Sequence, residues 1–489
     1  MSVRTRVAPS PTGYPHIGLI RTGLYCYALS KKNGGQFVLR LEDTDRSRFV
    51  EGATDEIYES FELYGLDIDE STKHGGDYGP YIQSERLDMY SEYAHLLVEK
   101  GAAYYCFLTP EETKNLQEQF RLENTRFRSP YRDMSLSESK QKVVSGESYV
   151  IRLKVPLDRE ITYEDGVQGK MKLNTNETSD VVLMKQDGFP TYHMAVAIDD
   201  HFMRISHVFR GFEWIPSIPV QILTYEALEW EMPKHYHLSV ILNPDGKGKL
   251  SKRKGTTNAV KFIEDGYLPN AMLNFLMLLG WSSPLKVEHG EKEREIFSLE
   301  EFVELFDPND LNKSNQRFDI NKLNWFNKQY MNSTEIEEFK SIFITWLEKF
   351  RSDDELYNSV INDTKLEEKL EIVKGRASTL VEALDSIRFF YTLSKPIDWD
   401  IKQLKKLNNK VSVVKENVID LIKSMSDDSS EWTHEAWEEG MRKIGDELGE
   451  KHGDVFMVLR IGVVGEPFSP PLFETIQILG KDEVLKRLK

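Results

Sequence analysis

The chain has 489 residues, of which 29% are charged and 40% hydrophobic, as expected of a globular protein with room for several domains. Its net charge of −17 argues against binding nucleic acid through overall charge, but it leaves local basic patches open. No apolar run approaches membrane-spanning length, and the first motif begins almost at Met1, so we expect no signal peptide. Two cysteines, Cys26 and Cys106, predict a reducing compartment and no disulfide framework.

The N-terminal stretch Thr5–Gly23 predicts a strand, a turn and a helix in succession. Residues 5–8 have the apolar texture of a short buried strand, Ser10-Pro11-Thr12-Gly13 is turn chemistry, and the apolar spacing after Pro15 indicates a helix. His16 and Gly18 therefore fall at the strand-to-helix junction, where helix N–H groups and a histidine can bind phosphate. The H-x-G triplet by itself fits an ordinary tight turn better, because three residues recur by chance.

The elements that follow indicate an α/β protein. A strand at 36–41 ends in the acidic run Glu42-Asp43-Thr44-Asp45, and a helix is expected at 53–64, so the start of the chain predicts a doubly wound parallel sheet. Residues 81–191 have the texture of an inserted α+β module. We expect the main sheet to resume with strands at 180–186, 191–197, 207–210 and 237–242.

The last third of the chain is almost wholly helical in its apolar spacing. The pattern predicts helices at 336–350, 366–393, 402–425, 433–448 and 455–462. Together they predict a helical bundle domain from about residue 333 onward.

A second distinctive segment, Lys249-Leu250-Ser251-Lys252-Arg253, follows the last predicted strand. Alone it fits a basic surface hairpin as well as a functional loop. Combined with the N-terminal string APSPTG-x-x-H-x-G-x-x-R-T, it resembles the paired adenylate-binding signatures of the glutamyl- and glutaminyl-tRNA synthetases, which are class I aminoacyl-tRNA synthetases. The resemblance extends nearly end to end and is greatest to the glutamyl enzymes.

The resemblance implies a domain plan and an activity. It implies a Rossmann-type catalytic domain at 1–80 and 192–250, an insertion at 81–191 that cradles the tRNA acceptor end, a lysine loop and stem-contact region at 251–332, and an anticodon-binding domain at 333–489. The expected activity is that of a glutamate–tRNA ligase, which uses ATP with Mg²⁺ to attach L-glutamate to tRNA-Glu. A cytoplasmic monomer with no membrane partner is expected.

The resemblance also assigns the residues that handle ATP. His16 and Gly18 would hold the phosphates, and Lys249 and Lys252 would neutralise them as pyrophosphate forms, which makes His16 and the two lysines the expected catalytic residues. Glu213 and Trp214 would line the adenosine side; a core tryptophan is the alternative. Leu19 stands where the general signature has a second histidine, as is common in glutamyl enzymes.

The amino-acid substrate needs cationic partners for two carboxylates and one anionic partner for its ammonium. By resemblance, Arg6 and Arg210 are the cations and Glu42 is the anion. Ala8, Ser10 and Tyr192 complete the expected glutamate site. Each charged residue taken alone also fits a structural salt bridge. Val196 replaces an asparagine found in bacterial relatives, which puts one polar contact in doubt.

Two further expectations concern zinc and the anticodon. Some family members hold a zinc ion in the insertion, but only Cys106 remains here, with Leu108, Tyr131 and Asp133 at the other positions, so we expect no zinc. Arg376 stands where discriminating bacterial enzymes read the last anticodon base; a helix-surface arginine is an equal alternative.

Three other functions compete with the leading one. A non-catalytic RNA-binding protein need not keep both signatures and the glutamate residues together. A glutaminyl enzyme would have an anticodon domain built mainly from β-barrels, whereas this one is helical. A shortened relative that modifies a tRNA base would lack that domain.

Overall fold

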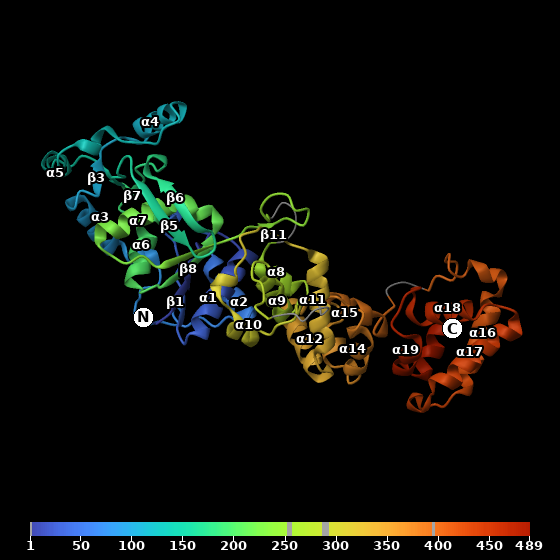
Figure 1. The fold of residues 1–489 in the computed structure, drawn as a ribbon. Coiled ribbons are helices and arrows are strands. Elements are labelled where there is room, and N and C mark those ends of the chain that lie inside the picture. The colour runs from blue at the N-terminus through green and yellow to red at the C-terminus, as the bar shows by residue number, and fades with distance from the viewer. Residues whose placement is uncertain (1, 252–256, 286–292, 394–396) are drawn as a thin grey trace. The chain divides into compact units, whose positions relative to one another are not determined.

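A computed structural model describes residues 2–251, 257–285, 293–393 and 397–489 (Figure 1). The chain divides into two compact units. One unit, called the catalytic unit below, comprises Met1–Lys261 and Met272–Ile320, and the other, the helical unit, comprises Phe262–Ala271 and Asn321–Lys489. None of the described helices is long and apolar enough to cross a membrane.

The catalytic unit is built on a four-stranded parallel sheet in the order β2-β1-β8-β9. The strands are β1 (Arg4–Val7), β2 (Gln36–Leu39), β8 (His207–Gly211) and β9 (Lys234–Leu238). The helices that accompany them are α1 (Ile17–Lys32), α2 (Ala53–Leu63), α6 (Tyr192–Phe202) and α7 (Ile218–Leu228). This arrangement confirms the predicted α/β class with its parallel sheet.

The first strand and helix form as the sequence predicts. All four residues of β1 are buried, and α1 begins at His16, whose ring caps the helix by accepting a hydrogen bond from the Gly18 N–H. Gly23 allows α1 to approach α2 closely, because a Cβ there would lie 2.5 Å from the Phe61 ring. The start of α1 is thereby capped by a side chain of the preceding turn, and its second turn packs closely on α2.

The insertion contains a three-stranded antiparallel sheet in the order β3-β4-β7 and a separate hairpin, β5-β6. Its elements are α3 (Leu87–Glu99), β3 (Ala103–Cys106), α4 (Pro110–Leu122), α5 (Leu136–Val144), β4 (Val150–Leu153), β5 (Glu160–Asp165), β6 (Gly169–Asn174) and β7 (Val182–Met184). The prediction that the main sheet resumes at 180–186 is wrong, because β7 pairs with β4.

The predicted strand at 191–197 is also wrong, because these residues begin helix α6. Met194 to Asp200 are all buried, so the run shows no polar face from which a helical period could be recognised. A continuous apolar run fits a buried strand and a buried helix equally. The predicted strand at 237–242 is divided between β9 and β10 (Ile241–Leu242), which pairs with β11 (Gln316–Arg317).

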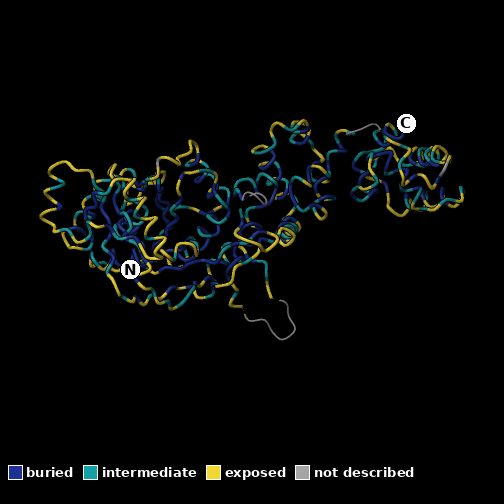
Figure 2. Tube along the Cα trace, turned by 90° about the horizontal axis from the view of Figure 1, so that it is seen from above, coloured by how far each residue is buried: buried dark blue, intermediate teal, exposed yellow. Residues whose placement is uncertain are grey.

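The remaining elements are helices, and each unit has a buried interior (Figure 2). They are α8 (Ala259–Glu264), α9 (Pro269–Leu278), α10 (Leu299–Leu305), α11 (Ile320–Ser333), α12 (Ile336–Phe350), α13 (Tyr357–Ile361), α14 (Leu366–Lys374), α15 (Leu380–Ile387), α16 (Val411–Ser424), α17 (His434–Leu448), α18 (His452–Val464), α19 (Leu472–Leu479) and α20 (Lys481–Leu488).

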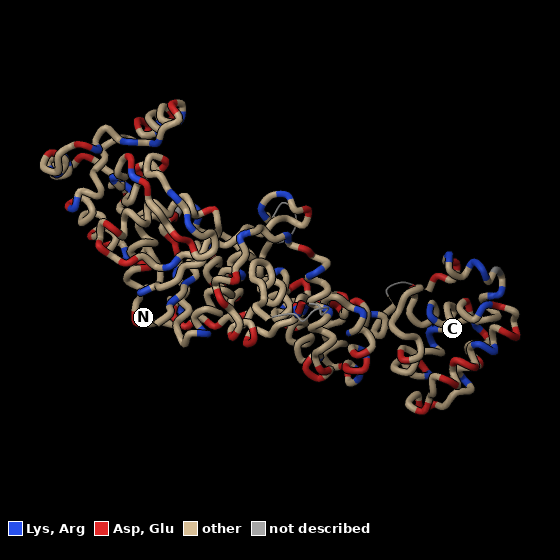
Figure 3. The backbone as a smooth tube through the Cα atoms, viewed as in Figure 1, with Lys and Arg blue, Asp and Glu red and all other residues tan. Residues whose placement is uncertain are grey.

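Two of the predicted long helices are interrupted. The one expected at 366–393 breaks after Lys374 and restarts at Thr379, whose hydroxyl caps α15 by accepting from the Glu382 N–H. The one expected at 402–425 begins as a 3₁₀ turn, Lys405–Lys410, before α16. That turn and its approach carry exposed lysines (Figure 3) at positions 402, 405, 406 and 410.

Candidate active site

A cavity of about 660 Å³ lies where β1, β8 and the start of α6 meet. The predicted glutamate residues all line it: Arg6, Ala8, Ser10, Glu42, Tyr192 and Arg210. Residues from segments up to about 200 positions apart therefore meet in one place. This position outside the carboxyl ends of parallel strands is where open α/β sheets bind ligands.

Arg210 lines this cavity, and one nitrogen of its guanidinium is unpaired. Its Nε donates to His237 Nε2 at 2.9 Å, and its Nη1 donates to the Tyr192 hydroxyl at 3.1 Å. Nη2 is buried and has no hydrogen-bond partner among the residues that the structure describes. A buried guanidinium donor left unsatisfied is costly, so this atom is suited to an anionic ligand.

Arg6 is already paired inside the protein. Its Nε and Nη2 donate to the two carboxylate oxygens of Asp200 at 3.1 and 3.0 Å. Arg40 donates to Asp200 at 2.7 Å and to Glu42 at 3.0 Å. Burial by itself raises the pKa of Asp200, but Arg6 and Arg40 outweigh it and lower that pKa to about 2.

The network continues through Asp199, which accepts from Arg86 at 2.7 Å, from Tyr90 at 2.9 Å and from Gln83 at 2.8 Å. Three arginines thus face three carboxylates at positions 6, 40, 86, 42, 199 and 200. All six side chains are at most 9% exposed. The network fixes the back wall of the cavity and is electrically neutral as a set.

The rest of the cavity is aromatic and polar. Tyr192 and Trp214 pack with their ring centroids 4.2 Å apart, and both line this cavity. Burial raises the pKa of the Glu42 carboxyl, although Arg40 and Arg6 act in the opposite direction. Val196, which stands at the asparagine position, is buried in α6 and is not among the lining residues.

A second cavity, of about 420 Å³, adjoins the first and shares Leu19 and Thr22 with it. His16, Gly18, Glu213 and Lys249 line it, as the resemblance leads us to expect for the nucleotide. Trp214, assigned by resemblance to the adenosine side, lines the first cavity instead. The described residues predicted for ATP and glutamate thus line two adjoining cavities.

His16 and Gly18 are locked together at the start of α1. His16 Nδ1 accepts from the Gly18 N–H at 2.9 Å, so the ring proton of a neutral His16 lies on Nε2. A Cβ at position 18 would lie 3.2 Å from Nδ1 and would press on the ring. Gly18 therefore helps to fix the orientation of the His16 ring.

Lys249 forms a 2.5 Å ion pair with Glu213. Burial raises the pKa of the Glu213 carboxyl, but Lys249 outweighs it, so the net shift is downward. Both side chains are about half exposed, at 60% and 47%. The pair is therefore open to exchange with a phosphate. Lys252, the other expected catalytic lysine, lies outside the described residues.

Cys106 is buried and donates from its thiol to the Ser129 hydroxyl at 3.3 Å. Nearby, Asp180 accepts from Arg132 at 2.7 Å, from Tyr104 at 3.0 Å and from the Val155 N–H at 3.0 Å. Within the described ranges, no group of three or more histidine, cysteine, aspartate or glutamate side chains could hold a metal ion. The surroundings of Cys106 in the insertion thus include an ion-pair network centred on Asp180.

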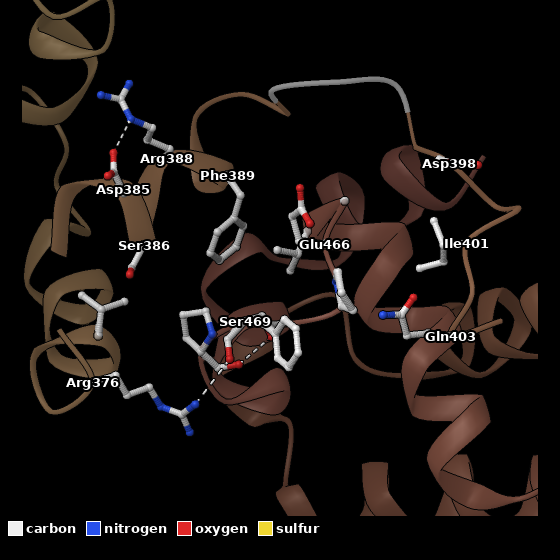
Figure 4. Close-up of a pocket in the computed structure, with 16 residues that line it drawn as sticks. Arg376, Asp385, Ser386, Arg388, Phe389, Asp398, Ile401, Gln403, Glu466 and Ser469 are labelled. Atoms are coloured by element: carbon white, nitrogen blue, oxygen red, sulfur yellow. Dashed lines mark hydrogen bonds and ion pairs between the residues drawn. The ribbon is translucent and has the colours of Figure 1, made fainter. Parts of the chain in front are cut away.

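Arg376 lines a pocket of about 550 Å³ in the helical unit (Figure 4). It makes one long contact there, from Nη1 to the Ser469 carbonyl oxygen at 3.4 Å. Phe468, on the same pocket, is 83% exposed. An exposed arginine beside an exposed aromatic ring offers hydrogen-bond donors and a stacking surface in one place.

Sequence reasoning missed the groups that hold the site together. Arg40, Asp199, Asp200, His237 and Asp165 were not expected to take part. One signal was available for Arg40, because a charge in the middle of the apolar strand run QFVLRL must find a partner when it is buried. The partners themselves lie far away along the chain and carry no local signature.

Comparisons with known proteins agree with this geometry. Residues 2–325 match the family described as tRNA synthetases class I (E and Q), catalytic domain, and residues 337–489 match the anticodon binding domain family. The chain is 38% identical to the glutamate–tRNA ligase of Finegoldia magna, with 99% of this chain and 98% of that protein covered. It is 40% identical to the glutamate–tRNA ligase of Clostridium kluyveri, with 100% and 97% covered.

Solved structures show the same likeness. The glutamate tRNA ligase of Elizabethkingia meningosepticum, crystallised in complex with its amino acid, superposes with a TM-score of 0.86 at 36% identity. The alignment covers 100% of this chain and 98% of that one. The glutamate-tRNA synthetase of Elizabethkingia anophelis gives a TM-score of 0.84, also at 36% identity, over 100% and 99% of the two chains.

Proposed function

This chain belongs to the glutamate–tRNA ligase family of class I tRNA synthetases, and we propose that it activates L-glutamate with ATP and transfers it to the 3′-terminal adenosine of tRNA-Glu. The observation that carries the substrate assignment is Arg210, which lines the cavity and has a buried Nη2 with no partner in the described part of the chain. A carboxylate placed there would satisfy this donor with a charge-assisted hydrogen bond.

The charges around the cavity favour glutamate over glutamine. The network of Arg6, Arg40 and Arg86 with its three carboxylates balances internally. Within the described ranges, Arg210 bonds to His237 and Tyr192 and to no carboxylate. A bound glutamate has a net charge of −1 and would offset the charge of Arg210. Glutamine would instead turn an amide toward guanidinium donors, and a mismatched buried donor costs about 1–3 kcal/mol or more.

This charge balance revises the one expected from the sequence. In that expectation, Arg6 and Arg210 alone paired with the two carboxylates of glutamate, and Glu42 paired with its ammonium group. Glu42 remains the partner we assign to the ammonium group, and Ala8, Ser10 and Tyr192 remain the neutral contacts. Arg6 acts together with Asp200, to which it is bonded twice. Its remaining surface on the cavity can still attract a carboxylate.

The activation step uses both cavities, with glutamate in the first and ATP in the second. The α-carboxylate of glutamate attacks the α-phosphorus of ATP, the bond to the bridging oxygen breaks, and pyrophosphate leaves. His16 can donate from Nε2 to a phosphate oxygen, and Lys249 can leave Glu213 to neutralise charge, since such reactions rely on positioning and electrostatics. Lys252 is proposed for the same role, and Gly18 and Glu213 for nucleotide binding. Mg²⁺ would arrive with the nucleotide.

The acyl group then passes to a tRNA ribose hydroxyl, and AMP leaves. We assign the insertion at 81–191 to the acceptor end, 251–332 to the stem and 333–489 to the anticodon. Arg376 and Phe468 support the last assignment, because they offer a donor fork and a ring for an unstacked base. Whether tRNA-Gln is also charged depends on how Arg376 reads that base.

Three smaller assignments complete the proposal. We assign no structural zinc to the insertion, because Cys106 bonds to Ser129 and Asp180 ties the neighbouring loop. Near one zinc per chain after extensive dialysis would contradict this. A cytoplasmic monomer is proposed, and light scattering with and without tRNA tests the monomer.

The deciding experiment offers L-glutamate and L-glutamine separately to the purified protein with ATP and total tRNA. We expect acylation with glutamate and at least a hundredfold lower kcat/KM with glutamine. Tight tRNA binding with no ATP–pyrophosphate exchange in the presence of tRNA would instead support a non-catalytic RNA-binding protein.

A further inference from the structure

Two buried side chains that do not line the cavity hold Arg210 from behind. Arg210 Nε donates to His237 Nε2 at 2.9 Å, and His237 Nδ1 lies 2.5 Å from Asp165 Oδ2. The His237 and Asp165 side chains are both 0% exposed. The three residues form a chain of hydrogen bonds that ends at the cavity wall.

Hydrogen-bond directions in this chain are fixed by chemistry. A guanidinium Nε–H can only donate, so His237 Nε2 must accept, and the ring proton lies on Nδ1, where it donates to Asp165. Burial lowers the pKa of His237, with Asp165 opposing it, which keeps the ring neutral. Burial raises the pKa of Asp165, but the bonds from His237 and from backbone N–H groups outweigh it and lower that pKa to about 2.

The carboxylate itself cannot turn. Its Oδ1 accepts from the backbone N–H groups of Val167 at 3.0 Å, Gln168 at 2.8 Å and His237 at 3.2 Å. This leaves Oδ2 for the histidine ring, with a long contact of 3.3 Å from the Tyr163 hydroxyl. The orientation of Asp165 is therefore set by the backbone.

Asp165 ends β5 and belongs to the insertion, whereas His237 lies on β9 of the main sheet. The two elements are pressed together at Gly166, whose N–H donates to the His235 carbonyl oxygen at 2.8 Å. A Cβ at position 166 would lie 2.2 Å from the Tyr236 ring, so only glycine fits this approach. The β5-β6 hairpin is thus seated tightly on β9.

We propose that Asp165 and His237 are positioning residues for substrate recognition: they fix the rotation of the Arg210 guanidinium at the amino-acid cavity. This inference rests on the proposed function, in which Arg210 binds a substrate carboxylate. Neither residue touches the substrate. Their contribution is preorganisation, because an arginine held in its binding orientation loses less freedom when the ligand arrives.

The sharpest test is Asp165→Asn, which keeps the size of the side chain. The three backbone donors retain an oxygen at the Oδ1 position, so the amide NH₂ replaces Oδ2 and faces His237 Nδ1. The ring proton must then move to Nε2, where it opposes the Arg210 Nε–H. We expect calorimetry to give roughly 10- to 100-fold weaker L-glutamate binding, since a buried donor is left unpaired.

Two readouts separate positioning from general damage. NMR of ¹⁵N-labelled histidines should show the His237 ring proton on Nδ1 in the original protein and on Nε2 in Asp165→Asn, while ATP binding stays unchanged. Tyr163→Phe is the matched control, because it removes only the 3.3 Å contact to the same oxygen, and its glutamate affinity should stay within about twofold.

A second pair of variants keeps the test decisive if Asp165→Asn does not fold. In His237→Gln the amide oxygen can reach the Nε2 position and accept from Arg210, whereas in His237→Asn the shorter amide occupies only the Nδ1 position. We expect Gln to retain at least tenfold more glutamate affinity than Asn. Equal losses in the two variants would overturn the proposal.

Arg210→Ala distinguishes this inference from the proposed function. Undiminished glutamate binding in Arg210→Ala would contradict the role assigned to Arg210 and, with it, the positioning proposal. Lost binding in Arg210→Ala together with unchanged binding in folded Asp165→Asn would contradict the positioning proposal alone.

Discussion

The two arginines assigned to recognition, Arg210 and Arg376, are held in opposite ways. Arg210 is buried, has two of its nitrogens fixed by hydrogen bonds, and rests on His237 and Asp165. Arg376 is exposed and makes a single 3.4 Å contact to a backbone oxygen (Figure 4). The difference matches the proposed ligands, because a small amino acid needs a preformed site, whereas an RNA base brings its own surface to a side chain that can adjust.

The same contrast governs what each arrangement costs to break. The cavity wall is a set of desolvated ion pairs, and removing one member leaves a buried charge without its partner. An exposed arginine loses little when its contact is removed, since water replaces it. Substitutions in the cavity wall should therefore lower the free energy of unfolding strongly. Substitution of Arg376 should instead change activity and leave the free energy of unfolding nearly unchanged.

The largest effect is expected for Arg40→Met. Arg40 is 0% exposed and pairs with Asp200, Glu42 and Asp199. Its removal takes the arginine partner from Glu42 and one of two arginine partners from each aspartate. We expect the free energy of unfolding of the catalytic unit to fall by about 3–5 kcal/mol in denaturant titration. Arg159→Met is the matched control, because it breaks an exposed pair with Glu226 and should cost at most about 1 kcal/mol. Equal losses would refute the contrast.

Next in size is the effect of Arg210→Ala on catalysis. Removing the buried donor should lower kcat/KM for glutamate by about a hundredfold or more, which corresponds to a charged hydrogen bond of about 3 kcal/mol. Arg210→Lys retains the charge but lacks the planar fork and the Nε–H that contacts His237, so we expect it to recover only part of the loss. Acylation kinetics of both variants check this, and full activity in Arg210→Lys would mean that charge alone suffices.

Local chemistry made the start of the fold predictable. The turn residues before His16 and the apolar spacing after it define β1 and α1 in the sequence itself. Helix α6 was not predictable in this way, because its residues 194–200 are all buried and show no period. A sequence pattern therefore predicts a surface helix, which has one apolar and one polar face, more clearly than a helix buried in the interior.

The residues of the candidate site likewise fall into those that the sequence predicts and those that it does not. Arg6, Glu42 and Arg210 could be proposed from motifs, since each sits at a strand end that resembles a known signature. Their partners could not, because Asp200 lies 194 positions from Arg6 and 160 from Arg40. Pairing across such separations is decided by tertiary packing, and no local pattern reports it.

A smaller effect, specific to the buried region, is expected from acid. Burial, with Arg210 nearby, lowers the pKa of His193 to about 4, against about 6.5 for an unfolded histidine. Between these values the unfolded chain binds one more proton than the folded one, so stability is complete above about pH 6.5 and is lost as the pH falls toward 4. The slope is about 1.4 kcal/mol per pH unit.

Burial lowers the pKa values of His207, His235 and His237 as well, so their contributions have the same sign. Unfolding titrations of the original protein and of His193→Gln at pH 7, 6 and 5 measure the slope. In His193→Gln, the difference in bound protons between the unfolded and the folded chain should be smaller by about one proton. An unchanged slope would show that His193 is not neutral and buried in solution.

The smallest effect is expected at the exposed site, from Arg376→Gln. By the genetic code, the anticodons of tRNA-Glu and tRNA-Gln differ in their last base, which is C in one and G in the other. On its base-pairing edge, cytosine presents two adjacent acceptors, O2 and N3, to an arginine fork, whereas guanine presents two donors there, N1–H and N2–H₂, beside O6. We expect kcat/KM for tRNA-Glu to fall about tenfold and its advantage over tRNA-Gln to shrink, because a base contact contributes about 1–3 kcal/mol.

The free energy of unfolding and the KM for glutamate should not change, since the Arg376 side chain has one long contact among the described residues. Arg442→Gln, an exposed arginine of α17 paired with Glu438, is the control and should leave both tRNAs unaffected. If Arg376→Gln instead lowers stability and leaves the ratio of the two tRNAs unchanged, Arg376 is a structural residue and the proposed anticodon contact is wrong.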